Sequence, residues 1–102
     1  MRIITRKRLR EFAKRHPDAA EPLDKWYRVL WAAKWENLQA VRRVYPHADA
    51  VTVASGNTVT FFNLCGNKYR VIVAIHYNRQ RLYVLRLLRH AEYSKNLWKD
   101  RL

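Results

Sequence analysis

The stretch GNKYRVIVAI, from Gly66 to Ile75, decides how this chain folds. A Gly-Asn turn signal precedes a run rich in β-branched residues, which predicts the longest strand of a sheet over Lys68 to Tyr77. Asn78-Arg79-Gln80 separates it from a second apolar run, Arg81 to Leu88, so the two runs predict a β-hairpin. The sequence His90-Ala91-Glu92-Tyr93 follows and adds proton-transferring side chains at the open end of that hairpin.

The rest of the chain predicts helices before the hairpin and short strands between. Thr5 is the expected N-cap of a helix from Arg6 to Arg15, which ends because the residue before Pro17 avoids the helical region. Pro22 fits the first turn of the next helix. In order, the predicted elements are a strand at 1–4, helices at 6–15, from 18 or 19, and at 35–44, strands at 50–54, 58–64, 68–77 and 81–88, and a helix or tail at 92–101.

This order predicts an α+β fold in one domain, residues 1–102. Helices gathered early and strands gathered late favour a twisted, mainly antiparallel sheet, with the N-terminal strand and the helices packed on one face. The other face is then free for a ligand. Trp26, Trp31 and Trp35 recur at helical spacing. They form either part of the core or, less commonly at such spacing, a platform for stacking bases.

The net charge of the chain indicates which kinds of partner it binds. The chain carries 21 Lys and Arg against 8 Asp and Glu, a net charge of +13. Such self-repulsion favours a polyanionic partner: nucleic acid first, an acidic protein second, and a membrane surface last because no basic amphipathic segment stands apart. No apolar run approaches the length of a membrane span, so a cytoplasmic protein is expected. The four histidines lack metal-ligand spacing, and neither a metal nor a cofactor is expected.

The hairpin register decides which side chains share a face. Alternation puts Arg70 and His76 on one side of the long strand. A three-residue loop would pair Tyr77 with Arg81 and place Arg70 opposite Leu88, whereas a two-residue loop would reverse the faces. We assume the first register, which gathers four side chains on the ligand face: Lys68, Arg70, Arg86 and His90.

These residue types match the needs of RNA cleavage without a metal. A base must take the proton of the 2′-hydroxyl, an acid must protonate the departing 5′-oxygen, and cations must hold the phosphate. His90 and Tyr93 are candidates for proton transfer. The candidate phosphate-binding residues are Lys68, Arg70, Arg86, Lys95 and His76.

Each candidate also has a purely structural interpretation. Lys68 and Arg70 are compatible with a polar strand start, His90 with a helix cap, and Tyr93 with packing. His76 is more simply an ordinary hydrogen-bonded histidine at a strand end. Arg86 is more telling, because a charge inside an apolar run is costly unless it is paired or at a site. The cations of residues 6–15 are expected to form a solvated face that helps dock a phosphate surface.

Several segments together resemble a known toxin family. They are Met-Arg-Ile-Ile-x-Arg-Lys-x-Leu-Arg-Glu-Phe at 1–12, His16-Pro17-Asp18-Ala19, Trp26-Tyr27, Trp35, Asn67-Lys68-Tyr69-Arg70-Val71-Ile72 and His90-Ala91-Glu92-Tyr93. In order and spacing, they resemble the HigB-type toxins of the RelE/ParE superfamily. The resemblance implies a RelE-like fold and a metal-independent mRNA interferase that cuts messenger RNA on the translating ribosome. It also implies a HigA-like helix-turn-helix antitoxin. The toxin would then reach operator DNA only in complex with that antitoxin.

The same resemblance implies roles for single residues. Arg70 matches the arginine that contacts the scissile phosphate in RelE-like toxins, and His90 falls where a late proton donor is found. Tyr93 is near a late tyrosine of some relatives, at a different offset. The chain departs from the family pattern at Leu88-Arg89, where Gly-Thr is usual, and at Ser94, where many relatives carry aspartate.

Two other functions remain open from sequence. One is a non-catalytic, ParE-like toxin that inhibits a protein such as gyrase, which needs no His, Tyr and Arg constellation. The other is a plain RNA-binding module, whose affinity would fall steeply with salt and which would release no product.

Overall fold

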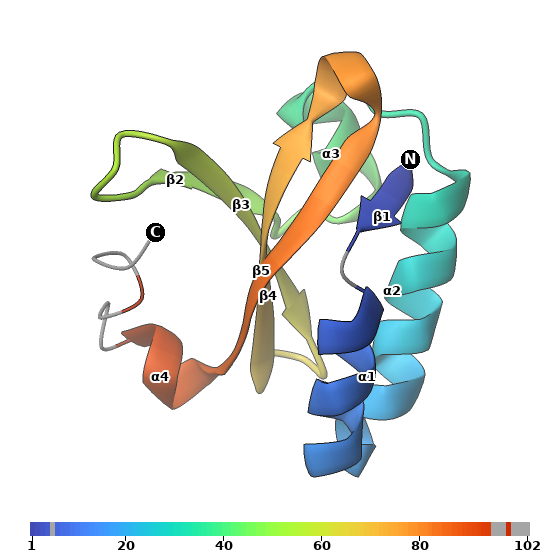
Figure 1. Ribbon diagram of the computed structural model, residues 1–102, viewed down its shortest axis with the longest axis vertical. Helices are drawn as coiled ribbons and strands as arrows, with labels where there is room; N and C mark the ends of the chain where they lie inside the picture. Colours follow the sequence, from blue (N-terminus) through green and yellow to red (C-terminus); the bar gives the residue numbers. More distant parts are fainter. Residues whose placement is uncertain (5, 95–97, 99–102) are drawn as a thin grey trace.

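The computed structural model describes residues 1–4, 6–94 and 98, and it shows a five-stranded sheet with two long helices along one side (Figure 1). The strand order is β1-β5-β4-β3-β2. The edge strand β1 (Arg2–Ile4) runs parallel to β5 (Arg81–Arg89), and the other neighbouring strands are antiparallel. The predicted α+β fold with a mainly antiparallel sheet is confirmed.

The order of the elements also follows the prediction. Thr5, the predicted N-cap, lies outside the described residues, and α4 begins two residues earlier than the predicted terminal helix. None of the helices in the described part of the chain is long and apolar enough to cross a membrane. The other elements are α1 (Arg6–Arg15), the 3₁₀ turn η1 (Pro17–Ala19), α2 (Ala20–Ala32), α3 (Leu38–Val44), β2 (Asp49–Thr52), β3 (Thr58–Leu64), β4 (Tyr69–His76), the 3₁₀ turn η2 (Tyr77–Arg79) and α4 (His90–Ser94).

The main core lies between α1, α2 and the sheet. Leu9 and Phe12 are the buried residues of α1, as their spacing predicts. On α2, Trp26 is 1% exposed and packs edge-on against the ring of Phe62 from β3. Trp31, by contrast, is 53% exposed, so the expected aromatic stripe does not enter the core as a unit. A helix with a stripe this wide cannot turn all of it toward one sheet.

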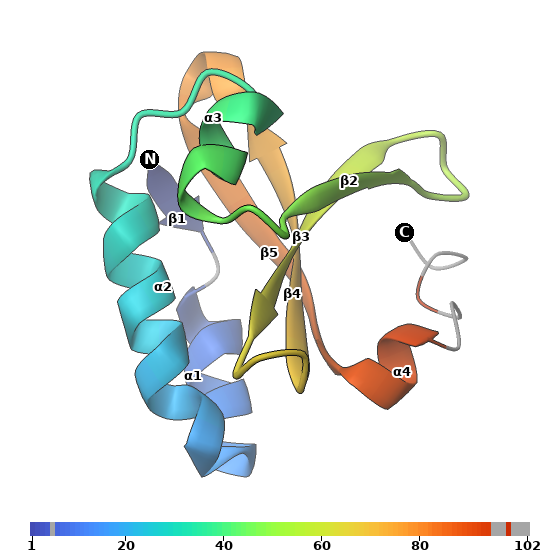
Figure 2. The same cartoon turned by 180° about the vertical axis from the view of Figure 1, so that it is seen from behind.

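A smaller apolar cluster covers part of the opposite face, which corrects the expectation of a free sheet surface. Val53, Val59, Ile72 and Trp98 are its buried members. Figure 2 shows α4 across the sheet from α1 and α2. We call this side of the sheet the open face. Ile72 and Val59 alternate onto it, and such side chains are stabilised when they are covered.

The β4–β5 hairpin has the predicted register only near its open end. Arg70 pairs with Leu88, as expected, but Arg81 pairs with His76 and not with Tyr77. A β-bulge at Leu85, where the register shifts between Ile72 and Val73, accounts for the difference. Because an extra residue on one strand changes the pairing by one step, the loop half and the open half of the hairpin follow different registers.

Candidate active site

Arg70 packs against two aromatic rings on the open face, and these rings also contact each other, with centroids 5.3 Å apart. Its guanidinium carbon is 4.1 Å from the centroid of the Tyr93 ring and 4.8 Å from that of Phe61. Tyr93 in turn stacks on Trp98, with ring centroids 5.2 Å apart and planes 24° apart. Cation–π contacts of this kind hold a guanidinium in place and leave its charge intact. The structure therefore brings together Arg70 and Tyr93, two of the predicted site residues.

The backbone explains how residues distant in sequence meet here. The β3–β4 register puts Phe61 opposite Ile72, next to the Asn63–Arg70 pair. Beyond the end of β5, the N–H of His90 donates to the carbonyl of Lys68 at 3.0 Å, which continues the ladder by one bond. Since α4 starts at His90, this bond directs α4 back over the start of β4 and carries Tyr93 onto Arg70.

Two polar atoms of this site lack a partner within the described part of the chain. They are Nε of Arg70 and Oδ1 of Asn63, both buried. The two residues are directly opposite in the ladder. Buried polar atoms without partners are uncommon, and they require an explanation such as a bound polar ligand. The sequence analysis did not predict Asn63 as a site residue. Its position two residues after Phe61 on the same strand, and so on the same face of the sheet, could have indicated it.

His90 belongs to the same end of the hairpin as Arg70. It is exposed, and it lies two residues beyond Leu88, the partner of Arg70. The first turn of α4 is anchored by Glu92, whose carboxylate accepts from Nε of Arg89 at 3.0 Å. This hydrogen bond from the Arg89 side chain lowers the pKa of Glu92. His90 thus sits at a fixed junction between β5 and α4.

His76 is not part of this group. It lies at the far end of β4, six residues and about 20 Å of extended strand from Arg70. There its ring meets the edge of Tyr83, with centroids 5.2 Å apart. No group of three or more His, Cys, Asp or Glu side chains in the described residues is arranged to hold a metal ion.

Lys68 also points away from Arg70. Its ammonium forms an ion pair with Asp18 of η1, and the hydroxyl of Tyr69 donates to the same carboxylate at 2.8 Å. The hydrogen bond that Lys68 donates to Asp18 lowers the pKa of Asp18 and raises the pKa of Lys68. Tyr69 belongs to the helix-side core, so Lys68 reaches toward the helices and the expected gathering of four cations does not form. Lys68 precedes the first residue of β4, so strand alternation does not hold its side chain on the face of Arg70. The ion pair with Asp18, fifty positions earlier in the sequence, directs it toward the helices.

Arg86 shares the face of Arg70 but reaches the edge of the sheet. It pairs with Ile72, two pairs along the ladder from the Arg70–Leu88 pair and on the same face. Its Nη1 donates to the carbonyl of Leu85 at 2.7 Å. Lys95 lies outside the described residues.

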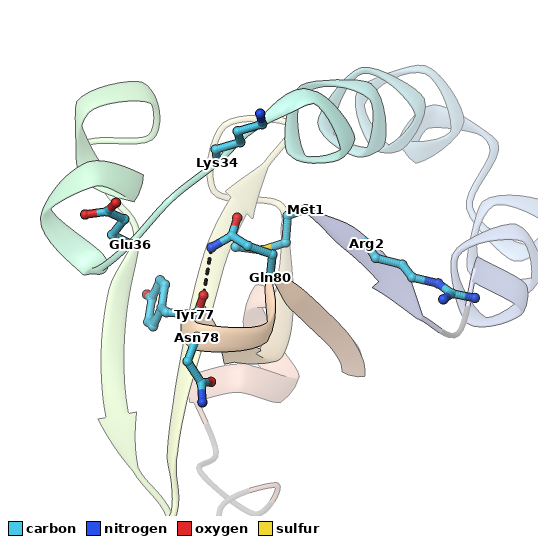
Figure 3. Close-up of a pocket in the computed structure, with 7 residues that line it drawn as sticks. All are labelled: Met1, Arg2, Lys34, Glu36, Tyr77, Asn78 and Gln80. Atoms are coloured by element: carbon cyan, nitrogen blue, oxygen red, sulfur yellow. Dashed lines mark hydrogen bonds between the residues drawn. The ribbon is translucent and has the colours of Figure 1, made fainter.

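A separate cavity of about 780 Å³ lies at the loop end of the hairpin (Figure 3). Gln80, whose φ is 52°, donates from Nε2 to the carbonyls of Tyr77 and Trp35 there. The lining residues are Met1, Arg2, Lys34, Glu36, Tyr77, Asn78 and Gln80. None of them is a predicted site residue, so this cavity is distinct from the Arg70 site.

Comparison with known proteins supplies the family. A model of the HigB toxins, described as the RelE-like toxic component of a toxin–antitoxin system, matches residues 19–96. The chain belongs to this family. The match includes β4, β5 and α4, so Arg70, His90 and Tyr93 all lie within it.

Curated HigB proteins extend the likeness to almost the whole chain. The mRNA interferase HigB of Escherichia coli O6:H1 is 30% identical over 95 residues, which cover 93% of this chain and 90% of the relative. The mRNA interferase toxin HigB of Escherichia coli K12 is 25% identical over 94 residues, covering 92% and 88%. A HigB of Shigella flexneri matches to the same extent. This HigB-family chain is therefore the toxic component of a toxin–antitoxin system.

Proposed function

We propose that this toxin is an endoribonuclease that cuts messenger RNA at the Arg70–Tyr93 site, without a metal, on the translating ribosome. The observation that carries the proposal is the guanidinium of Arg70, which packs against two rings on the open face and has an unpartnered Nε. The printed names of its curated relatives, mRNA interferases, support the same substrate.

The reaction in this proposal is an attack of the ribose 2′-hydroxyl on the adjacent phosphorus. The new O–P bond forms a 2′,3′-cyclic phosphate, and the bond to the 5′-oxygen breaks. Charge builds on the non-bridging oxygens, where the planar fork of Arg70 offers two parallel donors. Asn63 lies directly opposite Arg70, and its buried amide oxygen, which has no partner among the described residues, is available to accept a hydrogen bond from the RNA.

Proton transfer in this scheme falls to His90 and Tyr93. His90 is the general acid that protonates the 5′-oxygen, because imidazole is the side chain best suited to donate and accept protons under physiological conditions. Its exposed position beside the open end of the hairpin leaves room for a nucleotide. Tyr93 is the second proton-transfer group, which takes the proton of the attacking 2′-hydroxyl, and through its ring it also supports Arg70.

The family membership implies an antitoxin and an RNA target, and the proposal specifies them. The antitoxin is a HigA-like helix-turn-helix protein, and the toxin reaches operator DNA only in complex with it. Because the substrate is messenger RNA engaged by ribosomes, the site of action is the cytoplasm.

The test compares wild-type toxin and His90→Ala on messenger RNA, with and without translating ribosomes. Wild type is expected to give fragments at defined positions only when ribosomes are present. His90→Ala is expected to cut about 10²–10⁴-fold more slowly. Wild-type cleavage by the variant would remove His90 from the mechanism. Binding without any product, or inhibition of gyrase supercoiling in place of cleavage, would overturn the nuclease proposal.

A further inference from the structure

The cations of α1 are divided between two sides of that helix. Arg6 turns toward α2, where its guanidinium carbon lies 4.5 Å from the centroid of the Tyr27 ring. The side facing β5 forms one wall of a cleft of about 450 Å³. Its lining residues are Lys7, Arg8, Glu11, Phe12 and Arg15 from α1, and Leu85, Arg86 and Leu87 from β5. Four of these eight side chains are cationic and only Glu11 is acidic.

The bulge on β5 creates the centre of this cleft. Beyond Tyr83, the last residue of β5 paired with β1, the edge of β5 faces α1 (Figure 1). At the bulge, the carbonyl of Leu85 accepts from Nη1 of Arg8 and from Nη1 of Arg86, each at 2.7 Å. Two guanidinium groups therefore converge on one neutral oxygen. Each retains further N–H donors, and their mutual repulsion would be offset by an anion.

Glu11 offsets little of this charge. Its carboxylate lies 3.8 Å from the ammonium of Lys7, and both side chains are more than half exposed. Arg15, which is exposed at the end of α1, adds a further positive charge to the α1 side of the cleft, one turn beyond Glu11. The net charge of the cleft is thus close to +3.

The cleft continues from the proposed active site. Arg86 is the diagonal neighbour of Arg70 across the β4–β5 ladder, a spacing of roughly 7–8 Å between Cα atoms. Its side chain starts on the open face and ends at the edge carbonyl of Leu85. A polyanion leaving Arg70 would meet Arg86 first and the α1 cations next.

We infer that this cleft binds phosphates of the RNA strand beyond the scissile one. The inference rests on the proposed function for the identity of the polyanion. An acidic protein is the less favoured occupant, because protein interfaces centre on apolar and aromatic anchors. The large exposed apolar side chains among the described residues, Trp31 and Val44, lie on α2 and α3 and not in the cleft.

The test measures binding of a short 2′-O-methyl RNA oligonucleotide, which lacks the attacking hydroxyl, over a range of salt concentrations. The variant is Lys7→Gln with Arg15→Gln, because both residues are exposed and Arg8 keeps its bond to Leu85. The slope of log K against log salt is expected to become shallower by about 1.4, at roughly 0.7 per lost phosphate contact. Arg42→Gln with Arg43→Gln, exposed on α3, removes the same charge elsewhere and is expected to keep the wild-type slope.

An unchanged slope in the cleft variant, or an equal change in the α3 variant, would overturn the inference. Loss of antitoxin affinity with an unchanged RNA slope would overturn it too, and would assign the cleft to an acidic protein. Cleavage by wild-type toxin is scored separately. If the cleft variant changes the salt slope but wild-type toxin never cuts RNA, only the nuclease proposal is refuted. If wild-type toxin cuts RNA but the cleft variant leaves the salt slope unchanged, only this inference is refuted.

Discussion

The guanidinium of Arg70 rests 4.1 Å from the centre of the Tyr93 ring, although the two residues belong to different elements, β4 and α4. The contact depends on three separate pieces of geometry: the β3–β4 register, the β4–β5 register, and the bond between His90 and Lys68 that turns the chain into α4. Each of the functional predictions below probes one side of this contact.

Replacing Arg70 tests the phosphate contact. Arg70→Ala is expected to slow cleavage by about 10²–10³-fold, as the loss of one preorganised donor group does in other enzymes. Arg70→Lys keeps the charge but loses the planar fork and the stacking, so it is expected to recover only part of the rate. Single-turnover cleavage rates measure both. A lysine variant as fast as wild type would show that charge alone is sufficient.

Tyr93 has two separable roles, which two substitutions distinguish. Tyr93→Phe keeps a ring under Arg70 and removes the hydroxyl, so a cleavage rate about 10²–10⁴-fold lower is expected if that hydroxyl transfers a proton. Tyr93→Ala removes the ring as well, and is expected to lower the melting temperature in addition. If Tyr93→Phe cleaves as wild type does while Tyr93→Ala does not, Tyr93 is a positioning residue.

The ion pair between Asp18 and Lys68 predicts a pH dependence of stability. The folded-state pKa of Asp18 is lowered by its bonds to Lys68 and Tyr69, so its contribution is present above about pH 4 and is lost as pH falls through the lower folded value. Asp18→Asn is expected to destabilise the toxin near neutral pH, with the difference from wild type shrinking in acid. Urea unfolding across pH measures this.

Asp24 provides the matched control for that experiment. Its carboxylate also forms an ion pair, with Arg28 one turn along α2, and both side chains are largely exposed. Asp24→Asn is expected to change the free energy of unfolding by no more than about 0.5 kcal/mol. A pH profile for Asp18→Asn that matches the Asp24→Asn profile would mean that the link between η1 and Lys68 adds no stability.

Two tryptophans of α2 should respond very differently to truncation. Trp26 is 1% exposed against Phe62, whereas Trp31 is 53% exposed. Trp26→Ala is expected to lower the free energy of unfolding by about 3–5 kcal/mol, through lost burial and a remaining cavity. Trp31→Ala is expected to cost less than about 1 kcal/mol, because it leaves no hole in the core. Chemical denaturation of both variants provides the comparison.

Local patterns predicted much of the architecture. The bounds of α1 follow from Leu9 and Phe12 at helical spacing and from the stop before Pro17. The pairing of Arg70 with Leu88 was predicted from a three-residue loop. The loop has four unpaired residues, 77–80, so that premise is wrong, and the pair is correct because the bulge at Leu85 compensates for the extra loop residue. Alternation of period two is a strong signal wherever one side of a strand is buried.

What the patterns missed depends on contacts between distant segments. The bulge at Leu85 has no signature in a run of apolar residues, and it made the predicted Tyr77–Arg81 pair wrong. The pairing of Lys68 with Asp18 joins residues fifty positions apart, which no local spacing encodes. Asn63 enters the site only once β3 is placed beside β4. Roles in catalysis for Arg70, His90 and Tyr93 stay predictions.

The extra residue at Leu85 has a consequence for how the hairpin tolerates change. Pairing on the loop side of the bulge is already out of phase with pairing on the Arg70 side. We expect a one-residue change in the length of the 77–80 loop to be taken up at this bulge, with Leu88 kept opposite Arg70. The end of the sheet that carries Arg70 is therefore expected to keep its strand pairing when the loop at the other end changes in length.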